Sequence, residues 1–121
     1  MKLEIKRSKW LRGRYGSRLL NDEGEMCCLG FLCKTYGLDD SSIRNVTIPR
    51  NIVNVESSKL PAWLLLPAWL FAETKHGDAL NSVEGLVNTN DASYDQMNEQ
   101  AREADIIMKM ACQGIEVTFV D

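Results

Sequence analysis

The sequence predicts a small α+β domain in which strands near the two ends of the chain join one sheet that is packed by helices. Residues 2–6 (KLEIK) alternate between charged and apolar side chains, and residues 114–121 (GIEVTFVD) repeat this period of two. Such alternation is typical of a strand with one buried face. A chain of 121 residues, 45% of them hydrophobic, is enough for one core and too short for two, so we expect a single domain over residues 1–121.

The first strand places Leu3 and Ile5 on one side. Ser8 then stands where a helix N-cap is expected, so we predict a short helical turn over residues 9–12 that Gly13 ends. The C-terminal strand has a corresponding apolar face, formed by Ile115, Val117 and Phe119.

The segments between the strands are predicted from their turn residues and their periodicity. Residues 17–20 (SRLL) are a candidate short strand, stopped by the turn-forming sequence NDEG at residues 21–24. Residues 38–59 have scattered apolar positions, one proline and no clear period, so we interpret them as a connection with one short element. Residues 88–91 (NTND) are rich in side chains that bond their own backbone and predict a turn before the last helix.

The last helix is predicted by apolar positions at steps of four, three, four and three, the spacing of one helical face. These positions are Met97, Ala101, Ala104, Met108 and Ala111. Gly114 follows as the stop. The start is open, because Ser93 and Gln96 match a capping box while a start near Asn98 fits equally.

A local duplication, LPAWLLLPAWLF, occupies residues 60–71. Pro67 disfavours helical geometry at the residue before it, so we expect two short turns, each opened by its own proline. Tryptophans in an apolar run are ordinarily core residues. The alternative is an exposed patch that docks a host protein or a second subunit. Its candidate partner-binding residues are Trp63, Trp69, Leu70 and Phe71.

Three of the four cysteines gather in the segment GEMCCLGFLCKTYG, residues 24–37. In a helix that begins near Met26, Cys27 and Cys33 lie about 240° apart around the axis, and Cys28 and Cys33 about 140° apart. No two of the three then share a face, as ligands of one metal would. A tetrahedral zinc site is therefore disfavoured.

The remaining candidates for a thiol site are remote in the sequence. Completing a metal set would require Cys112 and His76, and His76 is also the only histidine available as the base for a catalytic thiol. We therefore expect no metal and no catalytic residue, and we interpret the cysteines as buried, reduced thiols. The same helix supplies further apolar side chains from Leu29, Leu32 and Tyr36.

Charge is distributed unevenly along the chain. Residues 1–20 carry seven basic side chains and one acidic side chain, while the rest of the chain has a net charge of −9. A basic segment with interleaved aromatic rings indicates an anion or nucleic-acid surface, and the alternative is that it complements the acidic body of its own domain. The candidate anion-binding residues are Arg7, Lys9, Trp10, Arg12, Arg14, Tyr15 and Arg18.

Other signatures of catalysis or of membranes are missing from the sequence. No phosphate-binding GxxxxGK[ST], GxGxxG, GxSxG or HExxH pattern occurs, so we expect neither an enzyme nor a cofactor. The longest apolar run without a charge, residues 60–72, has 13 residues against the about 20 that a membrane-spanning helix needs. The charged N-terminus lacks the apolar block of a secretory signal, so we expect a cytoplasmic protein.

Several blocks resemble a family of small uncharacterised proteins encoded by tailed bacteriophages and prophages. The likeness follows the order KxEIKRSKWLRG, SRLLNDEGEMCCLGFLC, LVNTND and AREADIIMKMACQGIEVTFVD, and it is loose over residues 38–87. Its most specific pieces are MCCLGFLC, the dipeptide Asn90-Asp91 and the closing GIEVxFVD. The resemblance implies a bacterial cytoplasm and an accessory role in infection, and it brings no established activity or active site.

Two functional hypotheses follow. The first is a non-enzymatic phage accessory protein that binds and modulates a host protein, such as a defence or transcription component, through the aromatic segment at residues 60–71. The second is a nucleic-acid or nucleotide binder that uses the basic segment on phosphates, with Trp10 or Tyr15 stacked on bases. The acidic remainder of the chain disfavours the second hypothesis, because it repels a polyanion.

Overall fold

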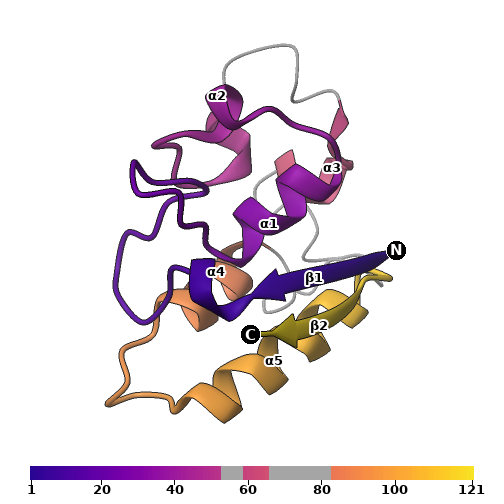
Figure 1. The fold of residues 1–121 in the computed structure, drawn as a ribbon. Coiled ribbons are helices and arrows are strands. Elements are labelled where there is room, and N and C mark those ends of the chain that lie inside the picture. The colour runs from indigo at the N-terminus through magenta and orange to yellow at the C-terminus, as the bar shows by residue number, and fades with distance from the viewer. Residues whose placement is uncertain (53–58, 66–82) are drawn as a thin grey trace.

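The computed structural model describes residues 1–52, 59–65 and 83–121 (Figure 1). It confirms the predicted α+β fold, in which strands from both ends of the chain form one sheet. The elements in chain order are β1 (Lys2–Lys6), the 3-10 helix η1 (Arg7–Lys9), α1 (Cys28–Thr35), α2 (Asp40–Ile43), the 3-10 helix η2 (Pro49–Asn51), α3 (Ala62–Leu65), α4 (Val83–Asp91), α5 (Glu99–Ala111) and β2 (Glu116–Val120).

The two termini meet in a parallel pair of strands, β1 and β2, which lie side by side in Figure 1. The register places Leu3 opposite Val117 and Ile5 opposite Phe119. Leu3, Ile5 and Val117 are buried and Phe119 packs against the core, so the alternating pattern turns the apolar side chains of both strands to the same face. The sheet thus ties the first and last residues of the domain together.

The predicted turn and strand after β1 are displaced. The helical turn is η1 and begins at Arg7, so Ser8 lies inside it and does not cap it. Trp10 instead forms an isolated bridge with Met26, where the main chain pairs on both sides of the tryptophan. The predicted strand at residues 17–20 is reduced to a single bridge between Leu20 and Arg44. These main-chain contacts come from distant segments, which local propensity does not encode.

Helix α1 carries the cysteine cluster into the core, as predicted. Cys27 is 4% exposed, and Cys28 and Cys33 are fully buried. Gly30 lies close to another segment, because a Cβ built there would lie 1.8 Å from the carbonyl oxygen of Leu19. The glycine therefore allows the main chain of a neighbouring loop to pass directly against the helix.

Helix α5 begins with Asn98 as its N-cap, whose Oδ1 accepts a hydrogen bond from the main-chain N–H of Ala101 at 2.8 Å. The alternative start at a capping box near Ser93 is wrong, because that segment forms a turn. The buried side of α5 also differs from the apolar face in the sequence: it consists of Arg102, Ile106 and Met110. Four of the five predicted face residues are exposed, namely Ala101, Ala104, Met108 and Ala111.

The middle of the chain contains more short helices than predicted. The described part of residues 38–59 holds two elements, α2 and η2, rather than one. Helix α3 follows Pro61, which confirms the first of the two predicted turns, and the turn predicted at Pro67 lies outside the described residues. Residues 88–91 form the end of α4 and not a turn. Helix α4 packs on both α1 and α5 and closes the core between them.

Candidate functional site

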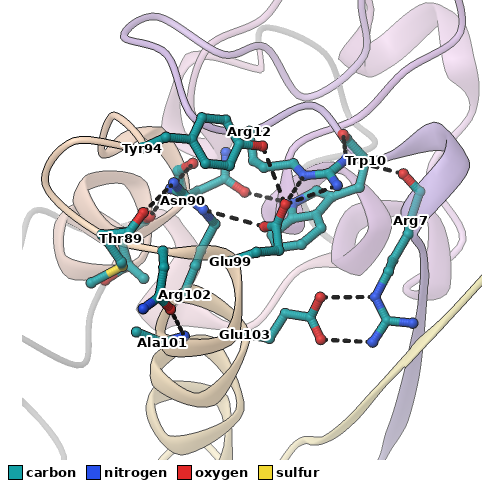
Figure 2. Close-up of polar contacts among 12 residues, drawn as sticks. Arg7, Trp10, Arg12, Thr89, Asn90, Tyr94, Glu99, Ala101, Arg102 and Glu103 are labelled. Atoms are coloured by element: carbon teal, nitrogen blue, oxygen red, sulfur yellow. Dashed lines mark hydrogen bonds and ion pairs between the residues drawn. The ribbon is translucent and has the colours of Figure 1, made fainter.

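Arg7 of the N-terminal basic segment pairs with two carboxylates near the other end of the chain. Its Nε and Nη2 donate to the two carboxylate oxygens of Glu103 at 2.8 and 2.7 Å (Figure 2), and its Nη1 donates to Asp121 at 2.9 Å. The hydrogen bonds to Glu103, followed by those to Asp121, raise the pKa of the Arg7 guanidinium further above its ordinary value. The bidentate contact with Glu103 therefore ties the N-terminal segment to α5 and neutralises this arginine.

Arg12 is neutralised in a similar way. Its Nε and Nη2 donate to Oε2 of Glu99 at 3.1 and 3.0 Å, and its Nη1 donates to the carbonyl oxygens of Arg7 and Trp10 (Figure 2). The guanidinium carbon lies 4.6 Å from the centroid of the Trp10 ring. This arginine thus fastens the N-terminal segment to α5 and covers the tryptophan with a cation–π contact.

Trp10 is a core residue. Its side chain is 2% exposed, and its ring packs against Phe119 with the centroids 4.7 Å apart. The prediction that Trp10 offers a ring for base stacking is wrong, because neither face of a buried ring is free to receive a base. Its Nε1 finds a partner inside the domain, the side-chain oxygen of Asn90.

Asn90 on α4 joins three segments with one buried amide, 1% exposed. Its Oδ1 accepts hydrogen bonds from Nε1 of Trp10 at 2.8 Å and from the main-chain N–H of Cys28 at 3.1 Å. Its Nδ2 donates to the carbonyl oxygen of Leu11 and to Oδ1 of Asp91, both at 3.0 Å. The amide is satisfied on every side, which identifies Asn90 as a structural residue.

Arg102 on α5 is fully buried and was not singled out from the sequence. Its Nη1 donates to the carbonyl oxygens of Thr89 and Asn90 at 2.7 and 2.9 Å, in the last turn of α4 (Figure 2). Carbonyls at a helix C-terminus lack partners within the helix and favour a positive charge. Arg102 therefore stabilises the end of α4, and Tyr94 covers its guanidinium at 5.2 Å from the ring centroid.

The exposed part of the basic segment is the loop between Gly13 and Gly16. Tyr15 at its tip is 98% exposed, and Arg14 beside it is exposed as well. The flanking glycines have φ angles of +81° and +80°, the left-handed region that glycine adopts without strain. A Cβ on Gly13 would also lie 2.6 Å from the ring of Tyr94. The two glycines thus shape a tight loop that presents Arg14 and Tyr15 to solvent.

Lys9 and Arg18 are two further exposed cations of the segment. Arg18 donates from Nη1 to the side-chain oxygen of Asn45 at 2.8 Å, and Lys9 is exposed on η1. Within residues 1–52, 59–65 and 83–121, neither Lys9 nor Arg14 forms an ion pair. We call the exposed residues Lys9, Arg14, Tyr15 and Arg18 the loop surface. These four residues are the part of the predicted anion site that is left once Arg7, Trp10 and Arg12 are assigned to contacts within the domain.

Two hollows border the loop surface, and both contain carboxylates. Arg14 and Tyr15 line a hollow of about 450 Å³ that also includes Asp91. Arg14 and Arg18 line a more polar hollow of about 250 Å³ that includes Asp22. Groups of both signs therefore lie around the loop, so its surroundings are a mixed surface and not a uniformly basic one.

The aromatic segment is described only in part. Trp63 lies on α3, is half-buried and packs against the core, which fits its interpretation as a core residue. Trp69, Leu70 and Phe71, the other candidates for binding a partner, lie outside the described residues.

The buried thiols are unsuited to nucleophilic chemistry. Burial raises the pKa of Cys27 to about 12 and that of Cys33 to about 12, and it raises the pKa of Cys28 well above its ordinary value. A thiol is nucleophilic as the thiolate, which these values suppress near neutral pH. In the part of the chain that the structure describes, no group of three metal-binding side chains gathers, and no helix is long and apolar enough to cross a membrane.

Comparisons of the chain with protein-family models, with curated proteins and with solved structures found no match.

Proposed function

We propose that this chain is a non-enzymatic binding protein that recognises a bacterial host protein through the loop surface, as an accessory factor of a bacteriophage. The observation that carries the proposal is the side chain of Tyr15, which is 98% exposed at the tip of a loop flanked by two glycines with positive φ. A large side chain held in solvent by a dedicated backbone contributes nothing to the core. We interpret Tyr15 as a contact residue for another molecule, because tyrosine is enriched among the residues that dominate protein interfaces.

The chemistry of the loop surface favours a protein as that molecule. Tyrosine and arginine are enriched among the residues that dominate protein interfaces, and Arg14 adjoins Tyr15. Asp91 and Asp22 line the two neighbouring hollows, so the surface offers both signs of charge. A protein partner can complement both signs, whereas the phosphates of a nucleic acid are repelled by the carboxylates.

The setting follows from the resemblance to phage proteins and from the thiols. Three buried cysteines are free, which agrees with a reducing compartment such as the bacterial cytoplasm. Trp63 is half-buried, so the aromatic segment is a weaker candidate surface than the loop, and its residues 69–71 keep their place as secondary candidates.

A pull-down from a bacterial host lysate tests the proposal. The immobilised chain, its Tyr15→Ala variant and its Arg14→Ala variant are compared, and the bound proteins are identified by mass spectrometry. Lys6→Ala is the matched control, because Lys6 is an exposed cation on β1 outside the loop surface. We expect one partner that the unmodified chain and the control retain and that the Tyr15→Ala variant loses. Equal capture by Tyr15→Ala would contradict the proposal.

Nucleic-acid binding is the second candidate, supported by the exposure of Lys9, Arg14 and Arg18 in the same segment as the exposed ring of Tyr15. It differs from the first in its salt dependence. Binding to phosphates weakens steeply between about 50 and about 200 mM salt, because each neutralised phosphate releases counterions. Salt-sensitive gel shifts with oligonucleotides, lost on Arg14→Ala and Arg18→Ala substitution, would place this function first.

A further inference from the structure

Strand β2 has one edge without a strand beside it. Its other edge pairs with β1, and no further strand of residues 1–52, 59–65 or 83–121 joins the sheet. The main-chain N–H of Glu116 donates to the carbonyl oxygen of Met1 at 2.8 Å, which fixes which residues face β1. Successive residues of a strand direct their N–H and C=O groups to opposite sides, so those of Val117 and Phe119 face the open edge.

An apolar groove lies between α5 and the start of β2. It has a volume of about 280 Å³, and its walls include Ile107 and Ala111 of α5 together with Ile115 and Val117. We call it the edge groove. Ile107, in the wall of the groove, is 41% exposed, and Met108, the next residue of α5, is 55% exposed. Figure 1 shows α5 running next to β2. The lining of the groove includes Glu116 and Val117, so the groove adjoins the strand that has the open edge.

The exposed side of α5 conflicts with its own sequence pattern. Ala101, Ala104, Met108 and Ala111 have the spacing of a helical face that packs against another surface, yet all four are exposed in the single chain. A two-stranded parallel sheet is also small for its class, because parallel strands are ordinarily found in larger, covered sheets. Both features are accounted for if a further strand and a further helix cover this margin.

A second copy of the chain supplies both a strand and a helix, and the N–H and C=O groups of its strand match those of the open edge. If β2 pairs with itself in antiparallel fashion about a two-fold axis at Thr118, Val117 and Phe119 of the second copy exchange their open N–H and C=O groups with Phe119 and Val117 of the first. This axis overlaps the whole strand, residues 116–120, with its own copy. The same rotation places the two α5 helices side by side, so that their apolar sides cover each other.

The charges on the exposed face of the sheet are compatible with this axis, because no two like charges lie opposite each other across it. Glu116 would face Val120 of the second copy, while Lys2 lies beside Glu116 within the chain. Lys6 of the second copy, next to that Val120, completes a row in which the carboxylate lies between two lysines. An axis moved to Glu116 would instead set two carboxylates directly opposite each other, which is destabilising.

We propose that a second copy of this chain binds at the edge groove, forming a two-fold dimer with a continuous four-stranded sheet whose centre is the antiparallel pair of β2 strands. The dimer does not depend on the loop surface or on the proposed host partner. It places one pair of identical residues directly opposite each other across the axis, the two Thr118 residues. In an antiparallel pair that does not exchange hydrogen bonds, opposite Cα atoms lie about 4.5 Å apart, within the range that a disulfide spans.

Cysteine cross-linking tests the axis directly. Thr118→Cys is introduced into a Cys112→Ser background, because Cys112 is the one exposed native thiol and Thr118 is exposed on the strand. The matched control is Glu4→Cys in the same background, since Glu4 is exposed on the same sheet face and pairs with Thr118 from β1, which is the outer strand of the proposed sheet. Under mild oxidation we expect a disulfide-linked dimer from Thr118→Cys alone. Equal cross-linking of both variants, or of neither, would overturn the proposal.

Sedimentation equilibrium of the unmodified, reduced chain gives an independent result. We expect a monomer–dimer equilibrium whose dissociation constant rises at least about tenfold on Met108→Glu substitution, because a buried charge without a partner opposes association. Lys34→Glu on α1 is the control, and it leaves the constant unchanged. A chain that stays monomeric up to its solubility limit, or a dimer that Met108→Glu does not weaken, would overturn the proposal. The proposal would also be overturned if the chain were a monomer that binds extended peptides at this edge.

Discussion

The indole N–H of Trp10 and the side-chain oxygen of Asn90, 80 residues apart in the sequence, form a buried hydrogen bond of 2.8 Å. The same oxygen receives the N–H of Cys28, and the same amide donates to the carbonyl of Leu11. One side chain therefore fixes the position of the N-terminal segment relative to α1 and α4. The position of the loop surface depends on this contact, because Arg12 and Gly13 follow shortly after Trp10 in the chain.

Asn90→Ala should lower the free energy of unfolding by about 3 kcal/mol, because it leaves the Trp10 Nε1, the Cys28 N–H and the Leu11 carbonyl without partners in the interior. Urea unfolding followed by tryptophan fluorescence measures the change. Asn88→Ala is the matched control: it removes an exposed amide from the same helix and should cost no more than about 0.5 kcal/mol. Equal stability of the two variants would show that the Asn90 contacts are not needed.

Gly30→Ala should destabilise the domain by about 3 kcal/mol or more, because the new Cβ would overlap the Leu19 carbonyl oxygen at 1.8 Å. The obstacle is main chain and cannot rotate away as a side chain would. Thermal unfolding monitored by circular dichroism measures the loss. Lys34→Ala on the same helix removes only an exposed ion pair with Asp40, so it should change the midpoint little. A Gly30→Ala variant that melts with the unmodified chain contradicts the close contact.

The buried thiols should make the domain less stable in alkaline solution. In the unfolded chain these thiols ionise near their ordinary pKa of 9.0, whereas burial in the folded chain raises the pKa of Cys33 to about 12. The folded state then binds more protons between these values, so the free energy of unfolding falls as pH rises from about 9 towards about 12. Stability from this source is fully present below pH 9.

The slope of stability against pH isolates that contribution. Cys33→Ala should reduce the alkaline slope by up to about 1.4 kcal/mol per pH unit, in addition to a constant packing loss. Cys112→Ser removes an exposed thiol and should leave the slope unchanged. Urea unfolding at a series of pH values above 8 gives both slopes, and identical slopes for the two variants would refute a buried, protonated Cys33.

The sequence predicted those parts of the fold that local periodicity encodes. The alternation in residues 2–6 and 114–121 indicated both strands, and the burial of Cys27, Cys28 and Cys33 follows from an apolar helix. The parallel pairing of the ends was not predictable from period alone, because it depends on how the helices between them pack.

Periodicity failed on α5 for a definite reason. The buried side of that helix contains Arg102, a residue type that is rarely buried, and its burial is repaid by the carbonyls of Thr89 and Asn90 on another helix. No local signal announces such a partner. The prediction that Trp10 stacks on bases failed for the same reason. Its neighbours in the sequence are basic, while its neighbours in space are Asn90 and Phe119.

The basic segment should divide into residues that stabilise the fold and residues that bind. Arg12 pairs with Glu99 and with two carbonyls while remaining partly exposed, so Arg12→Ala should lower the free energy of unfolding by about 1–2 kcal/mol. It should leave partner binding nearly unchanged. Arg14 is exposed at the loop, and Arg14→Ala should have the opposite profile, with unchanged stability and weakened binding.

Both variants remove one positive charge from the same segment, so a nonspecific effect of net charge would affect them equally. Stability is measured by urea unfolding, and binding by pull-down of the host partner and by gel shift with oligonucleotides at low and high salt. Weak, salt-sensitive nucleic-acid binding that both variants lose alike would indicate long-range charge attraction in place of a defined site. A loss confined to Arg14→Ala locates recognition at the loop, because only there does a described arginine stand beside an exposed aromatic ring without a carboxylate bound to it.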